Sequence, residues 1–192
     1  MAKKYEFQPD KPRSSWLSKL YLTKLQRQNL LKWFLYGLLL LILSLLQDVV
    51  LCRFRLFGAT TELVPIGIFI ISILEGTQRG CVFALVASIL YMFSGTAAGP
   101  HAMVTITVMA TITSIFRQGY LQKRFSSVLV CVVMSMVVYE AVVFAVALFL
   151  GNTYPDRYIG FAVTTGLSLI AVPVLYPILV AVSSIGGESW KE

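Results

Sequence analysis

The stretch WFLYGLLLLILSLLQDVV occupies Trp33–Val50 and decides the class of this protein. Asp48 is the only charged residue in it, and it lies near the end of the stretch. An α-helix needs about 20 mostly apolar residues to cross the roughly 30 Å of hydrocarbon in a bilayer. The stretch therefore predicts a membrane-spanning helix.

The charge of the 192-residue chain is sparse and unevenly placed. Charged residues make up 13% of it, about half of the roughly 25% found in an average soluble domain. Residues 1–32 carry eight of the 16 Lys and Arg, whereas residues 33–187 carry only twelve charged side chains in all. So little charge cannot cover a soluble surface. This excludes a soluble enzyme and predicts an all-α polytopic membrane protein.

Five further apolar segments follow the first, at 63–74, 80–93, 101–116, 128–150 and 160–182. Segment 63–74 is short, and the sequence leaves open whether it spans fully or re-enters. With the N-terminus in the cytoplasm, six spans place 13 of the 16 Lys and Arg on the cytoplasmic side, as the positive-inside rule requires. We therefore predict six transmembrane helices over 33–185, cytoplasmic termini, and a cytoplasmic tail over 186–192.

Residues 1–32 are predicted to be a basic cytoplasmic segment. From Ser14 onward, apolar residues recur at helical spacing, which predicts an interfacial amphipathic helix over 14–31. Anionic lipid is its expected partner, since each basic side chain near an acidic leaflet contributes about 1 kcal/mol. No nucleic-acid-binding motif accompanies the charge. A disordered tail that only sets topology is the alternative. The expected lipid-facing basic residues are Lys19, Lys24, Arg27 and Lys32.

Glu140 is the sharpest functional candidate, because it lies near the middle of segment 128–150. An ionisable residue at membrane depth costs roughly 2.5–3.5 kcal/mol on insertion scales, so Glu140 is expected to face the bundle interior. Ala141 and Ala145 form a small-xxx-small pair beside it, which favours a close helix neighbour. The residue either contacts a partner or ligand, or it fixes helix packing by a hydrogen bond within the bundle.

Other polar residues predict a turn and a network. Glu75, Gly76, Arg79 and Gly80 form a tight turn between two apolar segments, where glycines permit a sharp reversal and close helix approach. This turn is a second candidate partner interface. Hydroxyl groups at helical spacing favour bridges between helices. The candidate intramembrane polar network comprises Asp48, His101, Thr105, Thr107 and Thr111.

A search for catalytic motifs finds none. The chain has one histidine, no nucleophile elbow, no zinc motif and no phosphate-binding loop. A lone histidine cannot build a zinc site. The sequence therefore predicts a protein that is not an enzyme and that needs neither a cofactor nor a metal.

Several local features together resemble the MreD family of rod shape-determining membrane proteins. They are Leu45-Leu46-Gln47 at the end of the first span, the short Pro65-containing span, and the Glu75–Gly80 turn. A further feature is the stretch Ile89–Gly95, which leads to Gly99-Pro-His-Ala102. The resemblance covers residues 33 to about 185. Met92 replaces an acidic residue common in the family, so no role of that carboxylate carries over.

The resemblance implies a non-enzymatic scaffold in the plasma membrane of a rod-forming bacterium. Its expected partners are the bitopic protein MreC, cytoplasmic MreB filaments, and a RodA-like polymerase with its class B penicillin-binding protein. Helix contacts in the membrane would link the filaments to peptidoglycan synthesis. The expected interfaces lie around Glu140, Ala141 and Ala145, and around the Glu75–Gly80 turn.

A different class remains open. Six spans with a basic N-terminus also resemble the substrate-binding component of an energy-coupling-factor vitamin transporter, whose fold the MreD family resembles. The first helix of those components usually presents an Ala-xxx-Ala surface, whereas here it offers only Gly37 and Ser44 among leucines. A vitamin site would also need aromatic and polar groups near the outer loops.

Overall fold

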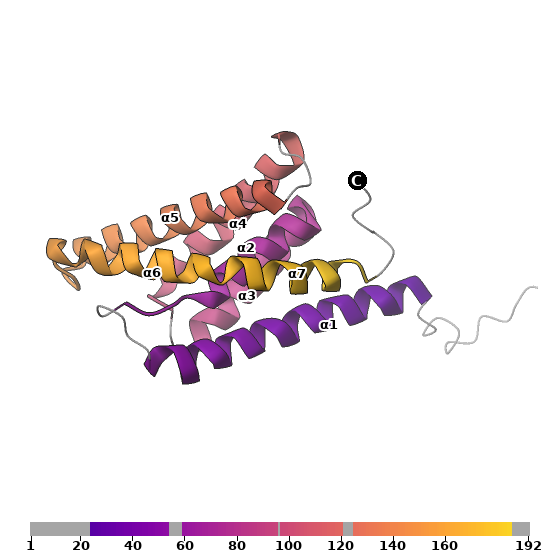
Figure 1. Cartoon of the computed structure of the whole chain (residues 1–192), viewed down its shortest axis with the longest axis horizontal. Coiled ribbons are helices and arrows are strands. Elements are labelled where there is room, and N and C mark those ends of the chain that lie inside the picture. Colours follow the sequence, from indigo (N-terminus) through magenta and orange to yellow (C-terminus); the bar gives the residue numbers. More distant parts are fainter. Residues whose placement is uncertain (1–23, 54–58, 96, 121–124, 186–192) are drawn as a thin grey trace, which may run out of the picture.

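The computed structural model of the chain describes residues 24–53, 59–95, 97–120 and 125–185 (Figure 1). The fold over these residues is helical, which confirms the all-α class. Short π and 3-10 turns, η2 (Leu46–Val50) and η3 (Leu51–Arg53), follow the first helix, and η4 (Pro155–Arg157) precedes the sixth. The α-helices are α1 (Lys24–Leu45), α2 (Leu63–Glu75), α3 (Thr77–Phe93), α4 (Pro100–Tyr120), α5 (Phe125–Phe149), α6 (Tyr158–Ile170) and α7 (Val172–Ser183).

Two of these helical segments, Gln26–Arg53 and Phe125–Phe149, are long and apolar enough to cross a membrane. The pair α6 and α7 forms a third candidate span that is bent by 46°. The remaining apolar helices, α2, α3 and Pro100–Phe116 of α4, are shorter than this criterion. Each predicted segment thus coincides with a helix or helix pair, and the chain has the character of a membrane protein. Six complete spans remain a prediction.

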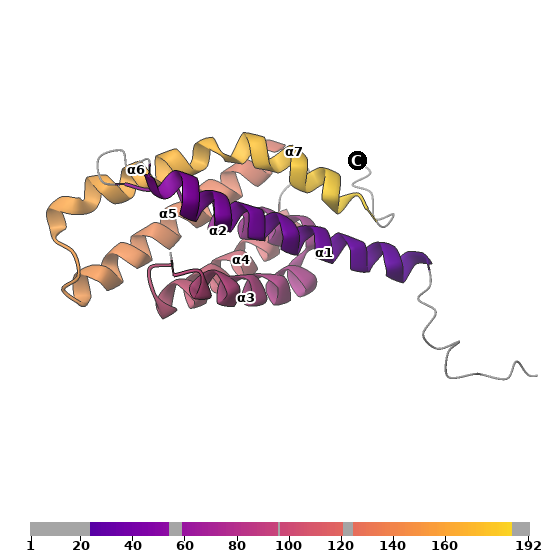
Figure 2. The ribbon, with the colours of Figure 1, turned by 90° about the horizontal axis from the view of Figure 1, so that it is seen from below.

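Successive segments run in opposite directions along one bundle (Figures 1 and 2). The start of α1, the α2–α3 turn and the end of α7 lie together at one end, which we call the Glu75 end. The start of α2 and the end of η2 lie toward the other end, which we call the Glu62 end. The first and last described residues therefore share one end of the bundle.

Helix α2 is the centre of the bundle. Every residue from Leu63 to Leu74 is buried, on all faces of the helix. A helix that is apolar all round can be stable only where neighbours cover every side, and α1, α3, α4, α5 and α7 all pack on α2. At 1.5 Å per residue, the 13 residues of α2 measure about 20 Å. Segment 63–74, for which the sequence left open whether it spans the membrane fully, is therefore the core of the fold.

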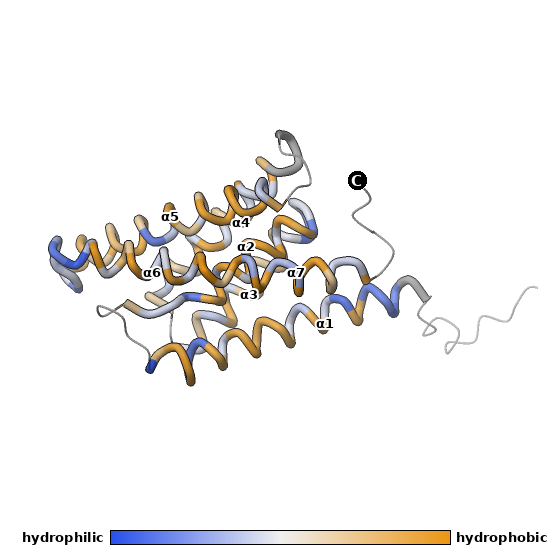
Figure 3. The backbone as a smooth tube through the Cα atoms, in the orientation of Figure 1, coloured by the Kyte–Doolittle hydropathy of each residue, from blue (hydrophilic) through white to orange (hydrophobic). Residues whose placement is uncertain are grey.

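Helix α1 does not begin at the predicted span boundary. It runs unbroken from Lys24, so the boundary predicted between residues 32 and 33 falls inside it, and residues 24–31 do not form a separate interfacial helix. Residues 14–23 of that predicted helix, and the tail 186–192, lie outside the described residues. Figure 3 shows the change of character along this one helix: its first described turns are mostly hydrophilic and the remainder is mostly hydrophobic.

The bend between α6 and α7 has a covalent cause. Pro173 has no amide hydrogen, so it cannot bond the carbonyl of Leu169 one turn earlier. The chain instead closes a tighter turn, in which the Ala171 amide donates to the Ser168 carbonyl at 3.1 Å. The bend therefore lies at Ala171, two residues before Pro173.

Candidate functional site

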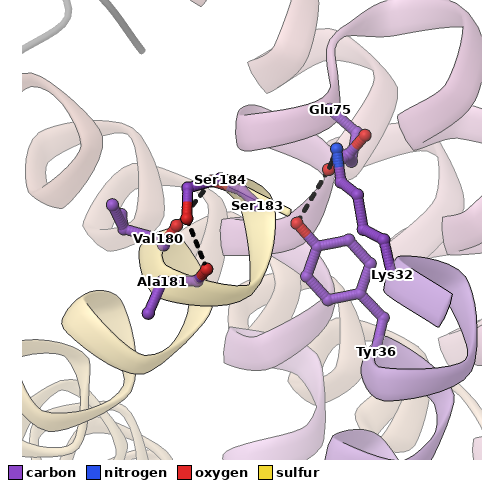
Figure 4. A network of polar contacts seen from close by, with 7 residues as sticks. All are labelled: Lys32, Tyr36, Glu75, Val180, Ala181, Ser183 and Ser184. Carbon is purple, nitrogen blue, oxygen red and sulfur yellow. Dashed lines mark hydrogen bonds and ion pairs between the residues drawn. The ribbon is translucent and has the colours of Figure 1, made fainter. Parts of the chain in front are cut away.

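A buried ion pair ties α1 to the end of α2 at the Glu75 end (Figure 4). Lys32 Nζ lies 2.7 Å from Glu75 Oε1, and the two side chains are only 5% and 2% exposed. The Tyr36 hydroxyl donates to the same oxygen at 2.7 Å. The last turn of α7, with Ser183, lies beside this hydroxyl. We call Lys32, Tyr36 and Glu75 the Glu75 cluster.

This arrangement corrects one prediction about lipid contact. Lys32 is buried and paired with Glu75, so its assignment to a lipid-facing basic segment is wrong. The reason is that α1 continues through the predicted interface and turns Lys32 toward α2. Arg27 is exposed, and the side chains of Lys19 and Lys24 lie outside what the structure describes.

The turn after Glu75 reverses the chain as its glycines predict. Gly76 has φ +83°, a conformation that side chains rarely adopt. A Cβ on Gly80 would lie 2.6 Å from the backbone oxygen of Ser72, so α2 and α3 touch through bare backbone here. The Ser72 hydroxyl donates to the Gly80 carbonyl at 3.2 Å. The predicted role of both glycines in reversal and close approach is confirmed.

The same burial overturns most of the second predicted partner interface. The Glu75 side chain is 2% exposed, and Gly76 and Gly80 are buried against this chain's own helices. These three residues are used within the fold and present no surface to a partner. Arg79, in the first turn of α3, is exposed.

A second polar contact holds the start of α2. The Gln47 side-chain oxygen accepts from the backbone amides of Leu63 and Val64 at 2.8 and 3.2 Å. Its amide nitrogen donates to the Tyr91 hydroxyl of α3 at 3.2 Å. The first amides of a helix have no intrahelical acceptor, and here a side chain from the π-helical turn η2 supplies one. Such π turns commonly occur at functional or structurally special positions.

The polar side chains of α1 and η2 that hold the two ends of α2 are separated by about the length of α2. Gln47 follows Tyr36 by 11 residues and Lys32 by 15, which corresponds to roughly 16–22 Å of helix. Helix α2 is about 20 Å long by the same rule. Helix α1 and the η2 turn that continues it therefore supply polar partners to both ends of α2.

Beside Gln47, two carboxyl groups lie within the Glu62 end of the bundle. The Glu62 amide donates to the Ser168 hydroxyl of α6 at 2.8 Å. The carboxyl groups of Glu62 and Glu140 lie within electrostatic range of each other, and the Tyr139 hydroxyl lies within range of both. We call Glu62, Tyr139 and Glu140 the Glu62 cluster.

The polar atoms of the Glu62 cluster are not equally satisfied. The Tyr139 hydroxyl lies close enough to the Glu62 carboxyl group to interact with it, whereas Glu140 Oε1 is shielded from solvent and has no hydrogen-bond partner among the described residues. A buried polar atom without a partner costs about 1–3 kcal/mol, so the fold alone does not account for the Glu140 carboxyl group. The prediction that Glu140 faces the bundle interior is confirmed, since the residue is 4% exposed.

Glu140 also forms part of the wall of a groove between α5 and α6. The groove has a volume of about 360 Å³, and aromatic and small side chains line it together with Glu140. Ala141 is exposed in this groove, and Ala145 is exposed one turn further along α5. The structure thus brings Glu140, Ala141 and Ala145 to the side of α5 that borders this groove, with Glu140 turned inward. We call the groove the α5–α6 groove. Its lining is Val137, Glu140, Ala141, Phe144, Tyr158, Phe161, Ala162 and Thr165.

The predicted intramembrane network is divided between two places. Thr107 and Thr111 of α4 bridge to α3 through Ser88 at 3.0 Å and Cys81 at 3.2 Å. Thr105 bonds the backbone carbonyl of its own helix at His101. Asp48 lies on the η2 turn after α1, where it accepts a hydrogen bond from Ser44 at 3.4 Å. The bridging role is confirmed for Thr107 and Thr111 but not for Thr105, and the grouping with Asp48 is not confirmed.

Several residues of these clusters were missed from the sequence. Glu62 precedes an apolar run and reads as the polar edge of a span, and Lys32 reads as part of a basic tail. Tyr139 directly precedes Glu140, which was the one available signal. No group of three or more metal-binding side chains occurs within the described residues. Comparison of the chain with protein-family models, with curated proteins and with solved structures finds no match.

Proposed function

We propose that this chain is a non-enzymatic membrane scaffold that holds a partner's transmembrane helix in the α5–α6 groove. The observation that carries the proposal concerns Glu140, which lines the groove and whose carboxyl oxygen Oε1 is buried without a partner among the described residues. In a bilayer, such an atom needs a donor from a neighbouring helix.

The surface around Glu140 suits a helix. Ala141 and Ala145 are exposed at i and i+4 on α5, and small residues at this spacing let helix backbones approach closely. Interhelical hydrogen bonds average roughly 0.6 kcal/mol in membranes, so close packing supplies most of the affinity. The Glu140 carboxyl then selects a partner that carries a donor at the matching depth.

The resemblance to the MreD family suggests which partner this is. A bitopic protein of the MreC kind has one transmembrane helix to place in the groove. Through it, the scaffold would join MreB filaments, a RodA-like polymerase and its class B penicillin-binding protein in the bacterial plasma membrane.

The test is co-purification of partners with the tagged chain from cross-linked native membranes, read by mass spectrometry. Ala141→Leu fills the groove, and Ala181→Leu is its matched control, because Ala181 is also exposed but lies on α7 outside the groove. We expect Ala141→Leu to lose the MreC-like partner and Ala181→Leu to retain it. Equal recovery with both variants would contradict the proposal.

Glu140→Gln and Glu140→Leu separate the roles of shape and polarity. Glutamine keeps a hydrogen-bonding group of the same size, whereas leucine removes it. We expect both variants to insert normally and only leucine to weaken co-purification strongly. If Glu140→Leu recovers partners as well as the unmodified chain, the carboxyl group has no part in the interface.

A second function has one observation in its favour. The α5–α6 groove is within the range of small-molecule pockets, roughly 300–1,000 Å³, and Phe144, Tyr158 and Phe161 line it beside the carboxyl group. A substrate-binding component of an energy-coupling-factor transporter would use such a site. In the same co-purification, recovery of ATPase subunits and a coupling membrane protein would select this alternative.

A further inference from the structure

A second groove, larger than the first, runs between α1 and α3. Its volume is about 830 Å³, and Val64 of the central helix α2 lies at its floor. Helices α1 and α3 diverge toward the Glu62 end, as Figure 2 shows, and both helices contribute lining residues along much of their length. We call it the α1–α3 groove. Its lining is Trp33, Gly37, Leu40, Leu41, Ser44, Leu45, Val64, Gln78, Arg79, Val82, Phe83, Val86, Ala87, Leu90 and Tyr91.

The two ends of the α1–α3 groove differ in chemistry. Gln78 and Arg79, both exposed in the first turn of α3, line it at the Glu75 end. The exposed Arg27 of α1 belongs to the same end. The walls toward the Glu62 end are leucine and valine side chains, and no acidic residue contributes to the described lining. The groove is therefore apolar along its length and positive at one mouth.

The walls suit flexible chains better than a helix. The walls carry large side chains that are between 50% and 66% exposed, namely those of Leu41, Val82, Val86 and Leu90. Helix interfaces in membranes are instead enriched in small residues. The small residues of the lining are Gly37 and Ser44 of α1 and Ala87 of α3, and no two of them lie one turn apart on the same helix. An acyl chain adapts to such an irregular apolar surface without a matching row of small residues.

We infer that the α1–α3 groove binds an anionic phospholipid, with its headgroup at Arg79 and Gln78 and its acyl chains along α1 and α3. The positive mouth provides the charge that complements a phosphate, and Arg side chains hold phosphate oxygens in two-pronged hydrogen bonds. Trp33 lies at the same end, where aromatic rings favour the headgroup level. This site is independent of the scaffold function proposed for the α5–α6 groove.

Gly37 offers a variant that tests the site without disturbing the fold. It lines the groove, and a Cβ built on it meets nothing within 4 Å. Gly37→Leu therefore fills the groove and also improves helix propensity. Gly166→Leu is the matched control, because Gly166 of α6 is equally open and lines neither groove.

The measurement is native mass spectrometry of the full chain in mild detergent, titrated with phosphatidylglycerol or with phosphatidylcholine. We expect the unmodified chain to retain phosphatidylglycerol preferentially, and Gly37→Leu to lose it while Gly166→Leu does not. Arg79→Gln should lower the preference for phosphatidylglycerol about fivefold, the equivalent of ~1 kcal/mol for one basic side chain near an anionic surface.

Two results would overturn the inference. One is equal lipid retention by Gly37→Leu and Gly166→Leu, which would place the bound lipid elsewhere. The other comes from a photo-cross-linking amino acid at Val86 in native membranes, where we expect a phospholipid adduct. Capture of a polypeptide at Val86 would show that the groove holds a helix instead.

Discussion

Replacing Lys32 by methionine tests whether the Glu75 cluster stabilises the bundle. Methionine keeps an unbranched stem and removes the ammonium group that lies 2.7 Å from Glu75 Oε1. Exposed ion pairs contribute only about 0–1 kcal/mol, but these side chains are 5% and 2% exposed. For a buried pair, removal of one partner costs about 3–5 kcal/mol, because the other charge stays buried.

The Tyr36 hydroxyl reduces this cost, since it continues to donate to Glu75 at 2.7 Å. A hydrogen bond to a charged group contributes about 1.5–3 kcal/mol, so we expect Lys32→Met to lose about 3 kcal/mol, the lower end of the range. The double variant Lys32→Met with Glu75→Gln removes both charges together. It should return to within about 1 kcal/mol of the unmodified chain, because a neutral pair has no charge to desolvate.

The assay is equilibrium unfolding of the full chain in mixed micelles with increasing sodium dodecyl sulfate, followed by helical circular dichroism. The two single variants and the double variant form a double-mutant cycle, which measures the coupling between the two side chains. If Lys32→Met lowers the free energy of unfolding by less than about 1 kcal/mol, the pair contributes no more than an exposed ion pair does, which would contradict the reasoning. Additive effects of the two single variants would likewise refute the reasoning.

Three further predictions use the same unfolding assay or hydrogen exchange. Gly80→Ala should destabilise the chain by about 1–3 kcal/mol through overpacking, because its Cβ would lie 2.6 Å from a backbone oxygen. Gly37→Ala should stabilise the chain by up to ~1 kcal/mol, because a Cβ there meets nothing within 4 Å. A stability change of the same sign in Gly80→Ala and Gly37→Ala would contradict this geometry. Gln47→Leu leaves the first two amides of α2 without acceptors, so they should exchange faster in hydrogen–deuterium exchange; unchanged protection would show that another group caps α2. The Thr113 hydroxyl of α4 shares a hydrogen bond with the Ser135 hydroxyl of α5, which also bonds the Cys131 carbonyl of its own helix. Thr113→Val should therefore destabilise the chain by only about 0.6 kcal/mol, and a loss above about 2 kcal/mol would contradict this.

Apolar run length predicted the helices, and residue spacing predicted the local contacts. The six segments could be predicted because each is a run of apolar residues. The turn at Gly76 and Gly80 could be predicted because glycines between two such runs indicate a chain reversal. The central position of α2 was not visible, although its cause is in the sequence. A short segment that is apolar on every face can be covered only at the centre of a bundle.

The contacts of Glu75 and Glu62 could not be predicted, because their partners are distant in the chain. Lys32 lies 43 residues before Glu75, in a stretch whose charge is typical of a cytoplasmic tail. Glu62 reads as a residue at the surface end of a span. Run length gave no sign of these contacts, because a helix of about 20 Å, shorter than the roughly 30 Å of hydrocarbon in a bilayer, looks the same in sequence whether its ends are covered or exposed.

The polar groups within the bundle therefore fall into two kinds. Those at the ends of α2 have partners that explain them: Glu75 is paired with Lys32, and Gln47 caps the first amides. Glu140 has a buried oxygen, Oε1, that none of the described residues satisfies. A packing role predicts satisfied atoms, because each unsatisfied one costs stability without fixing a geometry. Glu140 differs from Glu62 in also lining a groove, so a partner helix packed in that groove would lie against this residue. For this reason we expect its loss to change what the protein binds more than how well it folds.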